Sequence, residues 1–237
     1  MVDKIKTFIL IQKEKEPERL KKINYQIINL NLNEYLDINF FNYCWKDDIT
    51  EEVRNKYCKT DWTMKKHNRN MIDNPLTEGE ISLFLNWIFC LKHIREKYTE
   101  GKFLILESDV IFTDNFNNET IKQTMNDINL IEELDILNIG EGVPNSLCGY
   151  PKTKPTLVNN NKYYKENLNR CTEATIWKYT AVCKFLDYFE EKKDIDGPID
   201  TKIDVLATYV GKFNIFWPEK YMIRQGSHLK IFNSFIR

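Results

Sequence analysis

The stretch FLILESDVIF, residues 103 to 112, constrains the fold more than any other part of the sequence. The four consecutive apolar residues at 103–106 form the short run expected of a strand that is covered on both faces. Strands of this kind are typical of parallel sheets in α/β proteins. Side chains two residues apart point the same way on an extended chain. Glu107 and Asp109 are therefore expected on one side of the chain, at the carboxyl end of a buried strand.

Two carboxylates in this position suit a divalent cation. Mg²⁺ and Mn²⁺ prefer hard oxygen ligands, and they keep positions open for water or for the phosphates of a bound nucleotide. A solvated acidic turn is the alternative interpretation, because loops that follow strands often carry acids. The segment by itself leaves both interpretations open.

Length and charge limit the class of protein. A chain of 237 residues with 42% hydrophobic residues can bury roughly 70–75% of its unfolded surface around one core. We therefore expect a single domain over residues 1–237. The 34 basic and 35 acidic residues nearly cancel, which gives no reason to expect binding to nucleic acid.

The cysteines and the amino terminus indicate a cellular location. The six cysteines are widely scattered and form no CxxC pair, so we expect reduced thiols. The apolar run near the amino terminus is too short for a signal peptide or a membrane span, and no later stretch is long enough to form a transmembrane segment. These observations predict a soluble protein in the cytoplasm.

Strand-like and helix-like patterns alternate along the chain, which favours an α/β fold with a mostly parallel sheet flanked by helices. The predicted strands cover 7–11, 37–43, 103–106, 134–140, 174–177 and 213–217, and the predicted helices begin at or cover 17, 77–91, 119–132, 179–191 and 200–210. Residues 141–169 are rich in Gly, Pro and Asn and predict a long irregular loop. The tail 227–237 is expected to be peripheral.

Six motifs, taken in order, resemble glycosyltransferase family 25, which includes lipopolysaccharide sugar transferases and collagen galactosyltransferases. They are FILIQKEKEPER, LTEGEISLFLNW, FLILESDVIFTDNF, LDILNIG, ATIWKYTAVCKFL and GPIDTKIDVLATYVGKFNIFWPEKYMIRQGS. The resemblance covers most of the chain. It implies a GT-A-like fold with a Rossmann-like sheet, a nucleotide-sugar donor, usually a UDP-sugar, a divalent metal (Mn²⁺ or Mg²⁺), a glycan or glycoprotein acceptor, and inversion at the anomeric carbon.

The chain departs from the family pattern at several positions. Ser108 stands where the family usually has the middle acid of a Glu-Asp-Asp motif. Ser82 and Leu83 replace a common Gly-Cys, and Asn86 and Trp87 stand where a Ser-His pair is frequent. Two alternatives therefore stay open: a catalytically silent relative that acts as a binding or structural module, and another metal-dependent nucleotide-using transferase.

Glycosyl transfer requires a group that takes the proton of the attacking hydroxyl, and in an inverting enzyme a carboxylate fills this role. Asp200 is the first candidate, because it follows a Gly-Pro break at a helix start; an N-cap is its structural alternative. Asp204, one turn later, is the second candidate. His228 is a candidate third metal ligand beside Glu107 and Asp109, because the resemblance places its region near the nucleotide.

The candidate contacts to the nucleotide sugar are Gln12, Arg19, Glu80, Ser108 and Gln225. Gln12 and Arg19 follow the first predicted strand, and nucleotide sites in α/β proteins form at the carboxyl ends of strands. A surface salt bridge is the alternative role for Arg19. Glu80 is fully explained by a capping box, in which the Thr at position 77 and the Glu three residues later satisfy each other's backbone amides.

Overall fold

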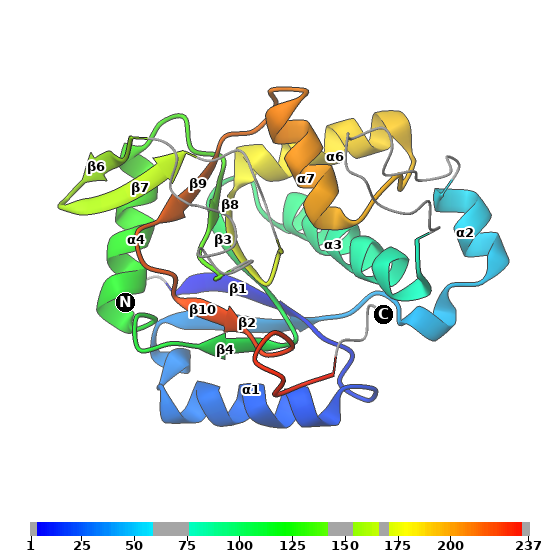
Figure 1. The fold of residues 1–237 in the computed structure, drawn as a ribbon, viewed down its shortest axis with the longest axis horizontal. Coiled ribbons are helices and arrows are strands. Elements are labelled where there is room, and N and C mark those ends of the chain that lie inside the picture. The colour runs from blue at the N-terminus through cyan, green and yellow to red at the C-terminus, as the bar shows by residue number, and fades with distance from the viewer. Residues whose placement is uncertain (1–3, 59–75, 142–153, 166–170, 234–237) are drawn as a thin grey trace.

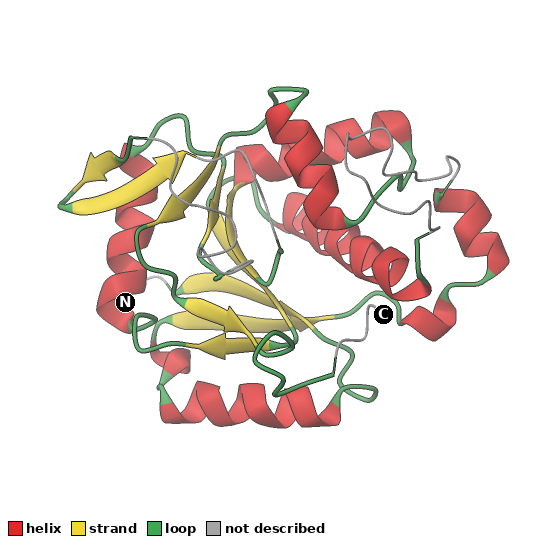
Figure 2. Cartoon of the chain, in the orientation of Figure 1, coloured by secondary structure: helices red, strands yellow, loops and turns green. Residues whose placement is uncertain are grey.

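The computed structural model describes residues 4–58, 76–141, 154–165 and 171–233. Strands and helices alternate through this part of the chain (Figures 1 and 2). The order is β1 (Ile5–Leu10), α1 (Pro17–Asn29), η1 (Leu32–Glu34), β2 (Leu36–Phe41), η2 (Lys46–Asp48), α2 (Glu51–Tyr57), α3 (Glu78–Lys97), β3 (Lys102–Glu107), β4 (Val110–Phe112), α4 (Asn118–Leu130), β5 (Ile136–Asn138), β6 (Thr156–Val158), β7 (Asn161–Lys165), β8 (Ala174–Lys178), α6 (Tyr179–Lys192), α7 (Ile199–Thr208), β9 (Ile215–Pro218) and β10 (Ile223–Gln225). Within these residues, no helix has both the length and the apolar character needed to cross a membrane.

The central sheet has eight strands in the order β2-β1-β3-β8-β5-β9-β7-β6. The prediction of an α/β fold with a large sheet flanked by helices is confirmed. Six strands run in one direction, but β8 and β7 run the opposite way, so three neighbouring pairs are parallel and four are antiparallel. The sheet is therefore mixed, because β8 inserts between β3 and β5 in the reversed direction. The GT-A-like and Rossmann-like assignment stays a prediction.

Two hydrophobic cores lie on the two faces of the sheet, because alternate side chains of each strand point to opposite faces. On β1, Phe8 and Leu10 join the core shared with α3, α6 and α7, whereas Ile9 joins the core shared with α1 and α4. Trp177 of β8 packs edge to face against Phe185 of α6, with ring centroids 5.6 Å apart. The strands are thus covered on both faces, as the apolar run at 103–106 predicts.

The predicted capping box starts α3. The Glu80 amide donates to the Thr77 hydroxyl at 3.2 Å, and the Glu80 carboxylate accepts from the Thr77 amide at 2.8 Å. These two bonds satisfy backbone amides that have no partner inside the helix. The helix that follows runs for 20 residues and buries one long apolar side against the sheet.

The predicted irregular loop at 141–169 contains a β-hairpin in its described part, so that expectation is corrected there; 142–153 and 166–169 lie outside the described residues. The hairpin, β6 and β7, extends the sheet by pairing with β9. The buried Asp127 of α4 holds it by accepting from the side chains of Asn159, Asn161 and Tyr163 at 2.7–2.8 Å. Asn159 and Asn161 of the Asn run therefore serve as donors to one distant carboxylate, which local composition does not reveal.

The tail was expected to be peripheral, but its described part packs next to the predicted acidic pair. β4 begins immediately after Asp109, and β10 pairs antiparallel with it. This pairing places residues 226–233 beside the end of β3. Gly226 lies so close that a Cβ there would meet the Phe232 ring at 2.6 Å and the Asp109 carbonyl oxygen at 2.8 Å. Residues 234–237 lie outside the described part of the chain.

Candidate functional site

The site lies at the end of the sheet where the carboxyl ends of β1, β2 and β3 meet. β2 and β3 pair with opposite edges of β1. The connection from β1 to β2 runs through α1 on one face, and α3 packs on the other face before β3. The carboxyl ends of the parallel neighbours β1 and β3 lie side by side at this edge of the sheet, and α/β proteins bind ligands at the carboxyl ends of strands.

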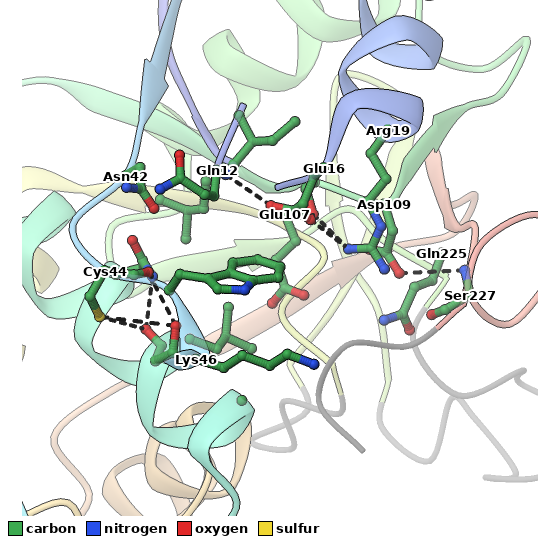
Figure 3. A pocket seen from close by; sticks show the side chains of 18 residues that line it. Gln12, Glu16, Arg19, Asn42, Cys44, Lys46, Glu107, Asp109, Gln225 and Ser227 are labelled. Atoms are coloured by element: carbon green, nitrogen blue, oxygen red, sulfur yellow. Dashed lines mark hydrogen bonds and ion pairs between the residues drawn. The ribbon is translucent and has the colours of Figure 1, made fainter. Parts of the chain in front are cut away.

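A pocket of about 660 Å³, part of it open to solvent, lies at these strand ends. Its two sides come from different parts of the chain (Figure 3). The strand ends, α1 and the C-terminal segment contribute Gln12, Glu16, Arg19, Glu107, Ser108, Asp109, Gln225 and Ser227. The turn after β2 and the start of α3 contribute Asn42, Cys44, Trp45, Lys46, Gly79, Ser82, Leu83 and Asn86. The structure thus brings together the outer acids and most of the predicted nucleotide contacts.

Glu107 ends β3 with only 8% of its surface exposed. Its carboxylate accepts a hydrogen bond from the Thr172 hydroxyl. Burial raises the pKa of Glu107 to about 8, and the neighbouring charges of Asp109, Glu173 and Asp200 add to this effect. A positive charge at this position would favour the ionised form of Glu107 and relieve the repulsion.

Asp109 is 3% exposed and lies beside the C-terminal segment. Its backbone carbonyl accepts from the Gly226 amide at 2.7 Å, and its Oδ2 accepts weakly from the Ser227 amide at 3.4 Å. Its other oxygen, Oδ1, is buried without a hydrogen-bond partner among the described residues. A buried carboxylate oxygen without a donor is costly unless a cation or another ligand compensates it.

The oxygen atoms at this side fit a hard divalent cation. Gln225 lines the same pocket, and its amide oxygen is also buried without a donor among the described residues. Mg²⁺ is commonly held by one or two carboxylates while phosphates and water complete its coordination. No cluster of three or more His, Cys, Asp or Glu side chains suited to a metal occurs in the described part of the chain. His228 is exposed and is not among the described residues that line the pocket.

Ser108, which replaces the middle acid of the family motif, connects a buried ion pair. Its hydroxyl donates to Glu16 and accepts from Arg19 at 2.7 Å, and Arg19 also pairs with Glu16 at 3.1 Å. A second Arg19 nitrogen donates to the Asn233 carbonyl at 2.7 Å. Arg19 is therefore a buried link between β3, α1 and the C-terminal segment. It is not part of a surface salt bridge, which was the alternative interpretation.

Asp200 lies in the first turn of α7, whose N-cap is Pro198, so the N-cap alternative for Asp200 does not hold. Burial raises the pKa of Asp200 even though the amides of Thr201 and Cys171 donate to it. Its charge also raises the pKa of Glu107, which indicates that it lies near the acidic side. Asp204 is buried further along α7. Neither aspartate, nor Glu80 in its capping box, is among the described residues that line the pocket.

Comparison with solved structures shows distant similarity. No family model matches the chain, and no curated protein matches it significantly. Among solved structures, the chain is similar to the apo form of the glycosyltransferase GlyE from Streptococcus pneumoniae TIGR4, with 15% identity and a TM-score of 0.41. The match covers 90% of this chain but only 45% of the GlyE chain. Similarity of this extent assigns no activity, and membership of family 25 stays a prediction.

Three residues of the site lack a clear sequence signal. Glu16 precedes a proline at a helix start, where acids are common for local reasons. Thr172 lies three residues beyond the predicted loop, and Lys46 is the first residue of the short helix η2. Their roles depend on partners far away in the sequence: Ser108 is 92 residues from Glu16, and Glu107 is 65 residues from Thr172. Local patterns do not identify such pairs.

Proposed function

We propose that this protein is a metal-dependent glycosyltransferase that moves a sugar from a nucleotide diphosphate donor, a UDP-sugar, to a hydroxyl group of a glycan or glycoprotein. One observation carries the proposal. Glu107 and Asp109 lie in a pocket at the carboxyl ends of β1 and β3, and the buried Asp109 Oδ1 lacks a donor among the described residues. A divalent cation would offset the charge repulsion between Glu107 and Asp109 and would be a partner for Asp109 Oδ1, and a diphosphate could bind to the same cation.

The residues that would hold the cation are Glu107, Asp109 and the amide oxygen of Gln225. A bound cation would supply positive charge to the diphosphate as it leaves. The chain's own contribution is to hold the two carboxylates in place: Thr172 fixes Glu107, and the β4–β10 pairing fixes Asp109. Gln12 and Arg19 are placed at the end of β1 and the start of α1, where they would orient the nucleotide.

In the transfer step, the acceptor oxygen attacks the anomeric carbon, the bond from that carbon to the diphosphate breaks, and the hydroxyl proton passes to a carboxylate. We assign that carboxylate to Asp200. Burial raises the pKa of Asp200, which makes it a stronger base than an ordinary aspartate, and its charge acts on Glu107. Inversion at the anomeric carbon and membership of glycosyltransferase family 25 are further parts of this proposal.

Thermal-shift and calorimetric titration with UDP, with and without Mn²⁺, tests the proposal. The parent should be stabilised by UDP only when Mn²⁺ is present. Asp109→Asn keeps the size of the side chain and an acceptor for the Ser227 amide but removes the charge, so metal-dependent UDP binding should be lost while the melting temperature without ligand changes little. Asp114→Asn is the matched control, because Asp114 is an exposed acid just beyond β4.

The outcomes separate the candidate functions. If no uridine nucleotide stabilises the parent with either Mn²⁺ or Mg²⁺, the proposal is wrong. If UDP-sugars bind with metal but no UDP is released in the presence of acceptor glycans, the catalytically silent binding module is the better description. A mass-spectrometric screen of donors and acceptors would then identify the sugar and the linkage.

A further inference from the structure

We infer that Lys46 binds the diphosphate of the donor from the side of the pocket opposite Glu107 and Asp109, and that Asn86 and Ser82 position it by clamping the turn at residues 43–46. This inference deepens the proposed function and rests on it. It concerns the helix positions at which the chain departs from the family pattern, and it gives those departures a physical role.

Asn86 uses both ends of its side-chain amide to hold the turn. Its oxygen accepts from the Tyr43 amide at 2.7 Å. Its nitrogen donates to the Cys44 carbonyl at 2.8 Å and to the Ser82 carbonyl at 2.9 Å. Only 9% of Asn86 is exposed, so these bonds form where water does not replace them easily. The backbone just before Lys46 is therefore fixed to α3.

Two more residues on the same side of α3 complete the clamp. The Ser82 hydroxyl donates to the Cys44 carbonyl at 3.2 Å. The Tyr43 ring stacks on the Phe89 ring, with an interplanar angle of 7°. Positions 82, 86 and 89 are four and three residues apart, which places their side chains along one helix face. A longer or differently shaped side chain at 82 or 86 would not make this set of contacts.

The clamp directs the following residues to the pocket. Cys44, Trp45 and Lys46 all line it, and the Trp45 amide donates to the Asp48 carboxylate at 2.6 Å, which starts the short η2 helix. Figure 3 shows the Lys46 side chain extended along the pocket, from the turn toward the side where Glu107 lies. Lys46 is half-buried, so its charge acts in a partly desolvated space.

A diphosphate bound at the acidic pair would present negative charge to the opposite side of the pocket. Arg19 and Lys46 are the cationic side chains among the described residues that line the pocket. Arg19 is held by Glu16, Ser108 and the Asn233 carbonyl. Lys46 reaches the pocket from the other side, where a diphosphate bound at the acidic pair would meet it. An ammonium is a compact donor well suited to phosphate oxygens.

Calorimetric titration of three probes tests the inference: UDP, pyrophosphate and uridine, each with MnCl₂. Lys46→Met removes the charge and keeps most of the apolar stem. It should weaken UDP and pyrophosphate about 10- to 100-fold, the range for loss of one charge-assisted hydrogen bond, and leave uridine unchanged. Lys46→Arg should restore part of the affinity. Lys15→Met is the matched control, because Lys15 is an exposed lysine that pairs with Asp47 beside the same turn.

The positioning role needs a measurement that simple destabilisation would not change. Asn86→Asp keeps the acceptor for Tyr43 but loses the donor to Cys44, and Ser82→Ala removes the smaller contact. Both should weaken UDP binding in the parent background. In the Lys46→Met background they should add little, because they act through Lys46.

Each outcome decides a separate question. If the parent binds none of the probes, the proposed function fails. If the parent binds UDP but Lys46→Met binds it as tightly, the inference is wrong while the proposed function stands. If the effects of Asn86→Asp and Lys46→Met simply add, Asn86 does not position Lys46. Equal weakening of uridine and UDP by Lys46→Met would place Lys46 at the nucleoside and also overturn the inference.

Discussion

The buried carboxyl of Glu107 should make stability fall as pH rises. Its pKa is about 8 in the folded protein, against an ordinary value of 4.5. Below pH 4.5 the group is protonated in both states and has no effect. Between the two values the unfolded chain loses the proton first, so the free energy of unfolding falls until the pH passes about 8. The difference between the two pKa values, at about 1.4 kcal/mol per pKa unit, lowers the free energy of unfolding by up to about 5 kcal/mol at high pH.

Glu107→Gln removes the titration but keeps the size and polarity of the side chain. Between pH 5 and pH 9 the parent should lose about 4 kcal/mol of unfolding free energy relative to this variant. Urea unfolding at several pH values, with the slope held common, measures the difference. Glu96→Gln is the control, because Glu96 is exposed on α3 and should follow the parent.

Mn²⁺ provides the second arm of the same experiment. A cation favours the ionised carboxylate, so added Mn²⁺ should stabilise the parent more at pH 8 than at pH 5, and should stabilise Glu107→Gln far less at either pH. Parallel stability curves for parent and Glu107→Gln across the pH range would refute the reasoning, since they would mean that Glu107 ionises without cost in the folded protein.

Three further substitutions have definite expected results. Asp200→Asn should leave UDP affinity within about two-fold and reduce turnover about 10²- to 10⁴-fold, as measured by UDP release; equal loss of both would make Asp200 a donor ligand. Asp127→Ala should lower the unfolding free energy by about 1–3 kcal/mol in urea titration, because it takes the acceptor from the buried Tyr163 hydroxyl and from the exposed Asn159 and Asn161 amides; an unchanged midpoint would contradict its role as the hairpin anchor. Gly226→Ala should cost about 1–3 kcal/mol and weaken Mn²⁺-dependent UDP binding, because the added methyl displaces Phe232 or the Asp109 backbone; a fully stable variant with parental UDP affinity would contradict this.

Much of the local structure was predictable because it depends on residues that are close in sequence. The apolar run before Glu107 became β3, with the acid at its last position. The Thr77–Glu80 capping box started α3, since both partners lie within one helical turn. The strand-and-helix alternation indicated the α/β class. Glu107 and Asp109 line the same pocket because residues two apart in the chain stay close together in the fold.

The tertiary structure decided everything that depends on distant pairing. The hairpin in the predicted loop forms because Asp127 gathers donors more than 30 residues away. β8 entered the sheet in the reversed direction, which no local period indicates.

The pocket itself was decided in the same way. The β4–β10 pairing placed Gln225 and Ser227 beside Asp109 and left His228 exposed, although all three follow one another closely in the chain. The Asn86 clamp brought Lys46 to the opposite side. The spacing of hydrophobic residues and the capping residues specify each helix or strand by itself. Contacts between segments far apart in the sequence specify which side chains meet. The sequence by itself therefore determined the acidic pair and the class of fold, and the tertiary structure determined which residues surround that pair.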